Sequence, residues 1–460
     1  MGVLPMLTIR RSNAFTSTPI FTTSLVPEEV LSILDTLEAN GFKSYLVGGA
    51  VRDAILGEVP HDWDIATSAT PEQVESIFNT YPSGKKFGIV TVITSNSTLY
   101  EVATLRKESD YSDGRHPDKI EFVTNIEEDL SRRDLTINAL AWNPREGLID
   151  LFDGVSDLKA NTIKFVGSPE KRILEDRLRI LRAIRFASKY GASIEHNSLE
   201  AIKHNPSLSG LSSERIRDEL FKILETPKPS VGLSLLAQTG VLQNVSIELA
   251  DMQGYEQNNP HHCYDLFYHT IYSIDNATNY LPIRLTMLLH DIGKLSTRAV
   301  DQDGVHHFNK HADYSVIFAK DLLQKLRVSK TLTTLVLKLV QYHDVSLPTK
   351  KSIRKVLLTF TSNEFKLLLE VRRADILAQH KQTISDKLLA LGETSKLFHE
   401  ILEEESAISL RDLAINGNDL LSLGYKGKTI GKILEKLLDI VQEDPSLNTR
   451  ESLLNRIEVD

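Results

Sequence analysis

The sequence predicts a multidomain α+β protein, with a head of mixed sheet and helices at the start and only helices after it. The chain has 460 residues, more than the ~100–200 residues that one domain usually holds. Strand-like runs are confined to the first third, and the helical spacing of apolar residues replaces them beyond about Gly167. The length and this change of pattern together predict several domains of two structural kinds.

Composition excludes other classes of protein. Hydrophobic residues make up 41% and charged residues 25% of the chain, an ordinary globular balance. No run approaches the ~20 consecutive apolar residues that a membrane helix needs, so we expect no membrane partner and a cytoplasmic location. The one cysteine, Cys263, can form neither an intrachain disulfide nor a cysteine-based zinc site, which also indicates a reducing compartment. Composition leaves the oligomeric state open.

The net charge of −9, taken for the whole chain, disfavours a nucleic-acid partner. The charge is unevenly distributed, however. Residues 1–160 carry 14 basic and 24 acidic side chains, whereas residues 161–230 carry 13 basic and 9 acidic ones. The basic excess of the second segment makes it the candidate nucleic-acid surface.

The individual elements follow from local patterns. Residues 26–40 have the period of an amphipathic helix with acidic side chains near its start, and a polar stretch with Gly114 and Pro117 separates the last two strands. The predicted elements of the head are, in order, a helix over 26–40, a strand over 43–47, a helix over 51–56, strands over 87–94 and 99–105, a loop over 108–118 and a strand over 120–123. The helices predicted beyond it cover 173–190, 198–203, 213–224, 231–238, 409–415 and 430–441.

A glycine pair and three acids form the first candidate site. Gly48 and Gly49 stand between a strand and a helix, where backbone N–H groups can approach a phosphate; the alternative is a glycine turn without a ligand. Asp62 and Asp64 are two residues apart, so in an extended segment their carboxylates share a face. Glu101 lies on a later strand. Such carboxylates suit a hard cation such as Mg²⁺, and the alternative is a solvated pair at a strand end.

A basic helix is predicted over 173–190. Arg179, Arg182 and Arg185 are spaced by three and share one flank, while Leu178 and Phe186 belong to an apolar side. The pattern alone fits a solvated basic face as well as a nucleotide-binding one.

Four short motifs follow one another along the chain. They are Gly48-Gly49-Ala50-Val51-Arg52-Asp53, Asp62-Trp63-Asp64-Ile65-Ala66-Thr67, Arg132-Arg133-Asp134 with Asn138-Ala139, and Glu175-Asp176-Arg177-Leu178-Arg179. In this order they resemble the motifs of the class II CCA-adding tRNA nucleotidyltransferases, a family that shares its catalytic head with bacterial poly(A) polymerases. The resemblance implies a polymerase-beta-like nucleotidyltransferase head.

The resemblance also implies a reaction, the template-independent addition of C, C and A to the tRNA 3′ end from CTP and ATP. Asp62 and Asp64 would hold two Mg²⁺ ions, with Glu101 as the third acid. One ion would lower the pKa of the tRNA 3′-hydroxyl, and the other would hold the triphosphate and the leaving pyrophosphate. The implied nucleotide-binding residues are Gly48, Gly49, Arg52, Arg133, Asp134, Asn138, Asp176, Arg179 and Arg182.

Within that set the resemblance assigns separate roles. Asp134 would contact the ribose, and Arg182 would lie near the triphosphate. Asp176 and Arg179 would read the Watson–Crick edge, because a carboxylate accepts from an exocyclic amine while a guanidinium donates to ring acceptors. The loop over 108–118 would move as the choice of base changes. Its full length resembles complete CCA adders, and an A-adding enzyme or a poly(A) polymerase stays as the alternative.

A second candidate site is rich in histidine. His269, His290, Asp291 and Asp375 occur at spacings that resemble an HD-type phosphohydrolase, and His311 and His343 are further candidate ligands. Neutral imidazoles and carboxylates together suit Mn²⁺, Ni²⁺, Fe²⁺ or Mg²⁺. We expect this domain to hydrolyse phosphoesters at RNA ends, such as 2′,3′-cyclic or 3′-terminal phosphates. The rival from another class is an HD phosphohydrolase whose head only binds nucleotide.

Together these interpretations predict one arrangement of domains. The expected partner is a tRNA 3′ end, and no DNA partner is expected. Residues 381–460, with the basic segment 161–230, would contact the tRNA through its shape and backbone. The predicted domains are a disordered leader (1–24), a catalytic head (25–160), a helical neck that selects the nucleotide (161–230), an HD domain (231–380) and a helical tail (381–460).

Overall fold

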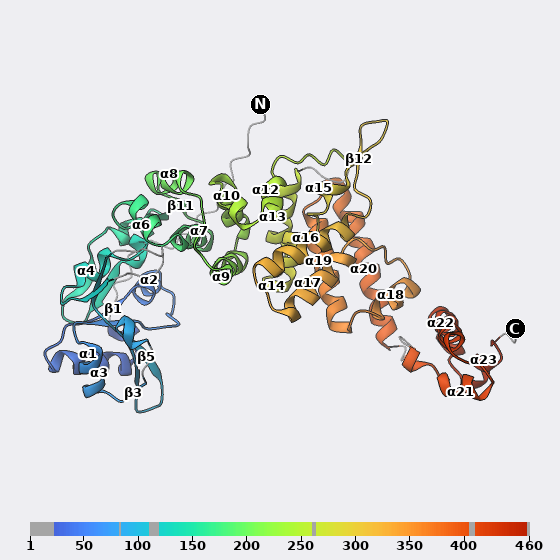
Figure 1. The fold of residues 1–460 in the computed structure, drawn as a ribbon, viewed down its shortest axis with the longest axis horizontal. Helices are drawn as coiled ribbons and strands as arrows, with labels where there is room; N and C mark the ends of the chain where they lie inside the picture. Colours follow the sequence, from blue (N-terminus) through green and yellow to red (C-terminus); the bar gives the residue numbers. More distant parts are fainter. Residues whose placement is uncertain (1–22, 82–83, 110–118, 260–263, 404–409, 458–460) are drawn as a thin grey trace. The chain divides into compact units, whose positions relative to one another are not determined.

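The computed structural model describes residues 23–81, 84–109, 119–259, 264–403 and 410–457. The chain forms two compact units, Met1–Ile247 and Glu248–Asp460, and Figure 1 shows their elements as a ribbon coloured along the sequence. The first unit holds a mixed sheet, and the described part of the second is mainly helical. The predicted α+β class is therefore confirmed. Cys263 and nearly all of the predicted leader lie outside the described residues.

A seven-stranded sheet forms the centre of the first unit, in the order β3-β4-β5-β2-β1-β8-β9. Its strands are β1 (Ser44–Val47), β2 (Ile65–Thr67), β3 (Thr80–Tyr81), β4 (Ile89–Ile93), β5 (Leu99–Thr104), β8 (Leu140–Asn143) and β9 (Gly147–Asp150). Among these described strands, β2 and β5 pair in parallel, and the other neighbours are antiparallel. The predictions at 43–47, 87–94 and 99–105 are confirmed as β1, β4 and β5. The pattern does not predict β2, whose three residues are too few to show a period.

Helices cover this sheet and fix the ends of its strands. They are α1 (Glu28–Ala39), α2 (Gly49–Ile55), α3 (Pro71–Ile77) and α4 (Ile126–Ser131). The predicted helices at 26–40 and 51–56 are confirmed as α1 and α2. Tyr45 and Val47 of β1 are buried with Leu105 and Leu130 in one hydrophobic cluster. This core holds the end of β1 in place, where the chain turns through Gly48 into α2.

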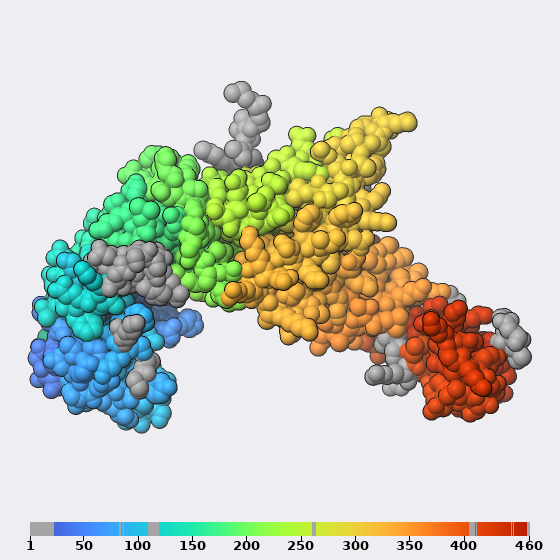
Figure 2. Space-filling view, in the orientation of Figure 1, coloured from blue at the N-terminus to red at the C-terminus, as the bar shows by residue number. Residues whose placement is uncertain are grey.

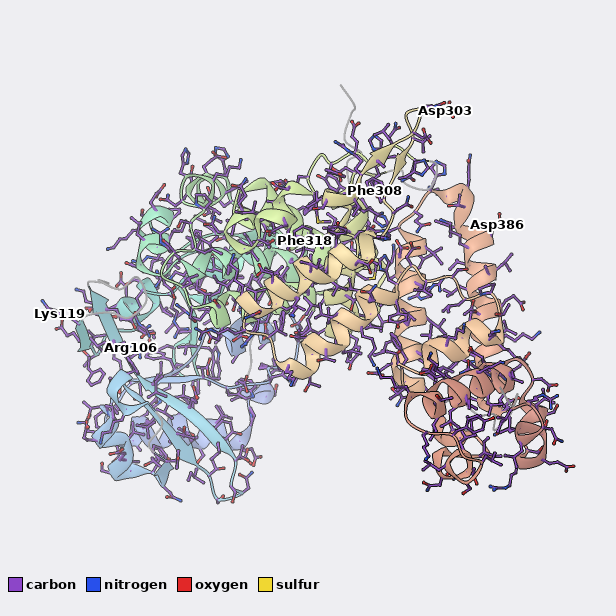
Figure 3. The ribbon with its side chains drawn as sticks, turned by 45° about the vertical axis from the view of Figure 1, so that its right-hand side comes forward. Arg106, Lys119, Asp303, Phe308, Phe318 and Asp386 are labelled. Carbon is purple, nitrogen blue, oxygen red and sulfur yellow. The ribbon has the colours of Figure 1, made fainter. Side chains whose placement is uncertain are left out.

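A separate hairpin replaces part of the predicted polar loop. Strands β6 (Arg106–Ser109) and β7 (Lys119–Phe122) pair antiparallel, and Figure 3 labels their first residues, Arg106 and Lys119. The prediction of a loop from residue 108 is therefore wrong at its start. The Glu108 carboxylate lies 2.7 Å from Arg106 and 3.0 Å from Arg132, so ion pairs support a strand that its polar composition conceals. Residues 110–118 lie outside the described part of the chain.

The remaining described helices of the first unit are α5 (Gly154–Lys159), α6 (Pro169–Glu175), α7 (Leu178–Tyr190), α8 (His196–His204), α9 (Ser213–Leu224), α10 (Pro229–Gln238) and α11 (Leu242–Val245). The single helix predicted over 173–190 is wrong, because the chain breaks at Asp176. This residue is extended (φ −150°), and its carboxylate accepts a hydrogen bond from the Leu178 N–H at 3.0 Å. A short parallel pair, β10 (Thr162–Ile163) with β11 (Ser193–Ile194), also interrupts the predicted all-helical region.

Most of the second unit consists of helices of four to 23 residues. They are α12 (Ile247–Asp251), α13 (Leu266–Asn276), α14 (Leu281–Leu289), α15 (Lys294–Thr297), α16 (His311–Lys325), α17 (Lys330–Tyr342), α18 (Lys350–Leu357), α19 (Ser362–Leu377) and α20 (Lys381–Glu403). An exception to the helical prediction is the hairpin of β12 (Ala299–Val300) and β13 (His306–His307). In the space-filling view this yellow hairpin projects from the unit (Figure 2).

The last described residues form a small helical cluster of their own. It contains α21 (Gly417–Ser422), α22 (Lys428–Glu443) and α23 (Arg450–Leu454), packed around Leu420, Val441 and Leu453. The helix predicted over 430–441 is confirmed as part of α22. The one predicted over 409–415 is wrong, since only a 3-10 turn forms there, at Leu410–Asp412. Nowhere in the described chain is a helix both long enough and apolar enough to span a membrane.

Candidate functional site

The parallel pairing of β2 and β5 brings two of the predicted acids together. Ile65 pairs with Val102, so one step back along both strands sets Asp64 opposite Glu101. Both side chains are exposed, and because strand residues alternate between faces they lie on the same side of the sheet. The Asp64 carbonyl also accepts a hydrogen bond from Val47 at 3.1 Å, which ties this acid to the end of β1.

Asp62 is exposed and stands two residues before Asp64. Partial loss of water raises the pKa of Asp64, the charge of Arg133 opposes this, and the negative charge of Asp62 raises the pKa further. The two carboxylates therefore repel each other. A divalent cation between them would remove that repulsion, so these oxygen donors fit a hard metal ion such as Mg²⁺.

Gly48 allows an arginine to lie against the turn between β1 and α2. Its backbone has φ +69°, and a Cβ atom placed there would stand 2.7 Å from Nη1 of Arg133. Arg133 is held from behind by Asp129, whose carboxylate lies 3.2 Å from Nη2. Within α2, Arg52 binds the side chains of Asn138 and Asp53. The glycine turn thus leaves room for two guanidinium groups beside the acids.

Replacing Gly48 by alanine is expected to move Arg133 and to weaken the binding of nucleoside triphosphate by about tenfold, the effect of losing one charge-assisted hydrogen bond. Gly57→Ala is the matched control. Gly57 also has a positive φ of +76°, but open space surrounds its Cβ position, so it carries the backbone penalty without the clash. Equilibrium binding of CTP to both variants measures the difference. Equal affinities would contradict the role of this contact.

One cavity of about 490 Å³ adjoins Asp64. It is lined by Gly48, Gly49, Arg52, Asp64, Arg132, Arg133, Asp134, Asn138, Asp176, Leu178, Arg179, Arg182, Arg185, Phe186 and Arg215. All nine residues that the sequence predicts to bind nucleotide are among them, whereas Asp62 and Glu101 lie outside this lining. Sequence reasoning does not assign Arg132, Phe186 and Arg215 to the site. Arg132 sits inside a predicted motif, but no local pattern marks Arg215, which α9 supplies.

Asp134 is buried and already holds several donors. Its carboxylate accepts from Nε of Arg182 at 2.5 Å, from the Leu135 N–H at 2.8 Å and from the Asn138 amide at 3.2 Å. Burial alone would raise the pKa of Asp134, but the positive charge of Arg182 and the hydrogen bonds from Arg182, Asn138 and Leu135 together outweigh it and lower the pKa to about 2. Asp134 therefore positions Arg182 and Asn138 at the cavity wall.

The lowered pKa of Asp134 makes part of the stability depend on pH. Since the folded pKa lies below the ordinary value of about 3.9, the contribution is present above about pH 4 and is lost as the pH falls through 2. Asp134→Asn should cost about 2 kcal/mol of unfolding free energy at pH 7. Urea unfolding of both proteins at stepped pH tests this. If the difference in unfolding free energy between the two proteins stayed the same from pH 7 to below pH 3, the ion pair between Asp134 and Arg182 would be contradicted.

The two residues predicted to read the base lie in the same cavity but are bound to different partners. The Asp176 carboxylate lies 2.8 Å from Arg215, and that of Glu175 lies 2.5 Å from Arg179. Arg179 also donates to the backbone oxygens of Arg132 and Arg172, each at 3.1 Å. The break between α6 and α7 places the side chain of Asp176 in the cavity wall. In a continuous helix the backbone of Asp176 would make helical hydrogen bonds, and its side chain would be placed differently.

Three guanidinium groups surround the ring of Phe186. The Cζ atoms of Arg185, Arg52 and Arg182 lie 4.3, 4.9 and 5.9 Å from the ring centroid. The negative face of an aromatic ring attracts cations, so Phe186 lowers the repulsion among these arginines. Arg185 is further held by the buried Glu219, 2.7 Å away. The result is a positively charged wall suited to a triphosphate.

The histidine-rich site gathers the six candidate ligands in the second unit. His269 comes from α13 and Asp375 from α19, while His290 and Asp291 follow α14. His311 begins α16, and His343 follows α17. Two groups form, each with its donor atoms within 4.8 Å of one another: His269, His290 and Asp375, and Asp291, His311 and His343. His261 and His262 lie outside the described residues, and His306 and His307 line a neighbouring cavity.

Asp291 stands between the two groups. Its Oδ2 lies 3.4 Å from Nε2 of His269 and 3.2 Å from Nε2 of His290, while its Oδ1 lies 3.3 Å from His311 and 3.7 Å from His343. Burial would lower the pKa of His290, but Asp291 and Asp375 raise it to about 10. These carboxylates favour a positive charge at this place, whether a proton or a metal ion carries it.

The tautomers of the four histidines also fit a metal. Each Nδ1 atom faces a backbone carbonyl oxygen, at 3.3 Å for His269, 2.8 Å for His290, 2.9 Å for His311 and 2.7 Å for His343. A carbonyl only accepts, so each Nδ1 carries a proton, and a ring that gives up its Nε2 proton would present the lone pair of Nε2 to a metal. This is the arrangement by which backbone groups orient metal-binding imidazoles.

Comparison with known proteins agrees with this geometry. Residues 44–164 match the poly A polymerase head domain, residues 191–252 the probable RNA and SrmB-binding site of polymerase A, and residues 310–457 the putative tRNA nucleotidyltransferase domain 2. The three matched segments are similar to domains of poly A polymerases and tRNA nucleotidyltransferases. A nucleotidyltransferase head implies a divalent metal ion, which the acids around Asp64 fit.

Curated proteins that are similar to this chain include CCA-adding enzymes. That of Ligilactobacillus salivarius is 47% identical over 219 residues, which are 46% of this chain and 54% of the relative. That of Limosilactobacillus reuteri is 47% identical over 218 residues, 47% of this chain and 54% of the relative. The chain thus spans about half the length of the curated relatives it matches.

Solved structures of nucleotidyltransferases resemble nearly the whole chain. The Bacillus stearothermophilus CCA-adding enzyme in complex with CTP has a TM-score of 0.66 and 26% identity, covering 93% of this chain and 97% of that one. The Thermotoga maritima CCA-adding enzyme complexed with tRNA has a TM-score of 0.59 and 20% identity, covering 94% and 97%. The second likeness concerns the fold alone.

Proposed function

We propose that this chain adds C, C and A to the 3′ end of tRNA, using CTP and ATP and releasing pyrophosphate. The observation that carries the proposal is the single cavity that joins Asp64 to all nine predicted nucleotide-binding residues. The relatives named CCA-adding enzyme and the similar structure with bound CTP support it. The chain would act in the cytoplasm and take no DNA.

The residues of the head divide the work of transfer. Asp62 and Asp64, with Glu101 beside them, would hold two Mg²⁺ ions, which when bound lower the pKa of the 3′-hydroxyl and stabilise the triphosphate. Arg52 and Arg182 at the Phe186 ring would bind the triphosphate oxygens. The hydroxyl oxygen attacks the α-phosphorus in line, and the bond to pyrophosphate breaks.

Base selection would use Asp176 and Arg179. In the described structure Arg215 and Glu175 hold these two side chains at the cavity wall. An incoming C or A offers Asp176 an amine donor and Arg179 a ring acceptor, whereas U and G offer the reverse at one or both places. Arg215 would position Asp176 for this contact, and the loop over 108–118 would move with the exchange of base.

Extension of tRNA tests the proposal. Labelled transcripts that end at the discriminator base, at CC and at CCA are incubated with the protein, Mg²⁺ and CTP or ATP, singly and together. We expect CTP to extend the bare end by two residues and both nucleotides to complete CCA. Extension of the CC end alone would indicate an A-adding enzyme, and long A tracts on unrelated RNA would indicate a poly(A) polymerase.

A second activity is favoured by the metal-binding geometry of the second unit. We propose that the six ligands hold two divalent cations, with Asp291 between them, and that the centre hydrolyses phosphoesters. Mn²⁺, Ni²⁺ and Fe²⁺ suit the four imidazoles better than Mg²⁺ does. Metal analysis after dialysis and hydrolysis of RNA oligonucleotides with phosphorylated ends test this. The rival function, a phosphohydrolase whose head only binds nucleotide, requires that tRNA extension fail while hydrolysis occurs.

The domain plan belongs to the same proposal. Residues 25–160 would form the catalytic head, 161–230 the nucleotide-selecting neck, 231–380 the HD domain and 381–460 the tail. The tRNA would contact the basic segment 161–230 and the tail through its phosphates. The match of residues 191–252 to a probable RNA-binding site supports the first of these contacts.

A further inference from the structure

Two cavities meet at the metal-binding residues of the second unit. Their volumes are about 280 and 320 Å³. Both are lined by His343, Asp344, Asp375, Gln379 and Lys387. Lys387 comes from the second turn of α20, so a residue of the predicted tail contributes to the wall of the predicted HD domain.

Among the lysines and arginines of these linings, Lys387 is the one that both cavities share. Its ammonium donates to the side-chain oxygen of Gln379, and the Gln379 amide donates to Asp375 at 2.9 Å. Across the described ranges, the structure records no carboxylate within ion-pair distance of Lys387. An ammonium group has three donors, so two remain for a ligand beside Asp375.

The charged side chains that line the two cavities cancel one another. The acids are Asp291, Asp344 and Asp375, and the cations are Lys294, Arg372 and Lys387. Lys294 lies 2.7 Å from Asp291, and Arg372 donates to the backbone oxygen of Val345 at 2.6 Å. Each divalent cation that binds to neutral imidazoles therefore adds two positive charges to a lining whose carboxylate, ammonium and guanidinium charges sum to zero. The loaded centre attracts a dianion more strongly than a monoanion.

We propose that Lys387 binds the phosphoryl group of a phosphomonoester, such as a 3′-terminal phosphate, at this metal centre. The inference rests on the proposed phosphoesterase function and narrows its substrate, because a monoester is a dianion whereas a cyclic diester carries one charge. Water forms the new bond to phosphorus, the phosphorus–oxygen bond to the ribose breaks, and the proton from water passes to the ribose oxygen.

The opposite wall has the side chains to contact the remainder of the substrate. His306, His307 and Phe308 line the larger cavity. Lys387 of α20 lines the same cavity as His306 and His307 of β13. The hairpin and α20 thus border the same opening, and a phosphate at Lys387 would leave its ribose between them.

The test compares Lys387→Met with Lys396→Met in the full chain loaded with Mn²⁺. Lys396 is an exposed lysine of the same helix, so both variants lose one positive charge from α20. We expect Lys387→Met to raise the Kd for inorganic phosphate, measured by calorimetry, and the KM for a 3′-phosphorylated oligonucleotide by about tenfold, as the loss of a charge-assisted hydrogen bond predicts. Metal content should not change, and Lys387→Arg should restore much of the phosphate affinity.

The outcomes separate the two proposals. Equal phosphate affinity in Lys387→Met and the unaltered protein would overturn the role of Lys387. Faster hydrolysis of a 2′,3′-cyclic end than of a 3′-phosphate would overturn the monoester assignment. Phosphate binding that depends on Lys387, without hydrolysis of either end, would overturn the phosphoesterase function and leave the binding site in place.

Discussion

Replacing Asp64 by alanine should lower the rate of nucleotide transfer by about a thousandfold, because metal ions at a phosphoryl-transfer site supply several kcal/mol of stabilisation. Asp64 lies at the junction of β1, β2 and β5, opposite Glu101 in the parallel register. Its side chain is exposed, so its loss should not disturb the core. The measurement is single-turnover extension of tRNA that ends at CC, with saturating ATP and Mg²⁺.

Two controls keep the Asp64 result specific. Asp35→Ala removes an exposed carboxylate from α1 and should leave transfer unchanged. Hydrolysis of phosphoesters by the second unit should also continue in Asp64→Ala. An Asp64→Ala protein that is folded and still transfers at more than a tenth of the original rate would refute the metal-binding role of this acid.

Asp291→Asn should abolish phosphoester hydrolysis, by at least about a hundredfold, and reduce the metal content. The asparagine keeps the volume of the buried side chain but removes the charge that faces His269, His290, His311 and His343. Metal analysis by mass spectrometry and hydrolysis assays with Mn²⁺ provide the readouts. Transfer of C and A by the head should remain at its original rate.

Asp291→Asn also removes the carboxylate that forms an ion pair with Lys294. The resulting loss of stability needs a control. Asp291→Asn combined with Lys294→Met removes both charges of the pair that lies 2.7 Å apart. The double variant should recover thermal stability but not metal or hydrolysis. Full metal content in either variant would show that Asp291 is not a ligand.

The sequence predicts site residues best where these residues lie close together in short motifs. Asp62 and Asp64, the glycine pair and the Arg132-Arg133-Asp134 run are local, and all but Asp62 line or adjoin the cavity. The position of Glu101 could also be predicted, because the sequence indicates the strand on which it lies. The metal ligands of the second unit are predicted through their resemblance to an HD-type phosphohydrolase, because His269, the His290-Asp291 pair and Asp375 are far apart in the chain.

The parts that the sequence did not predict depend on tertiary contacts. Arg215 enters the cavity because α9 packs on α7, and no spacing near residue 215 indicates this. The break at Asp176 follows from a side-chain hydrogen bond that competes with helix formation, which the apolar period over 173–190 does not register. Strand β6 forms because ion pairs at Glu108 compensate its polar composition. Lys387 belongs to the predicted tail, and only the packing of α20 shows that it lines the cavities beside His343 and Asp375.

Each of the two sites draws its described residues from one compact unit. A substitution at one site therefore changes the residues of one unit only. During evolution, the residues of one centre could therefore be gained, lost or changed to suit another metal without any change to the residues of the other centre. The two proposed activities could thus be kept or lost independently, although one chain carries both.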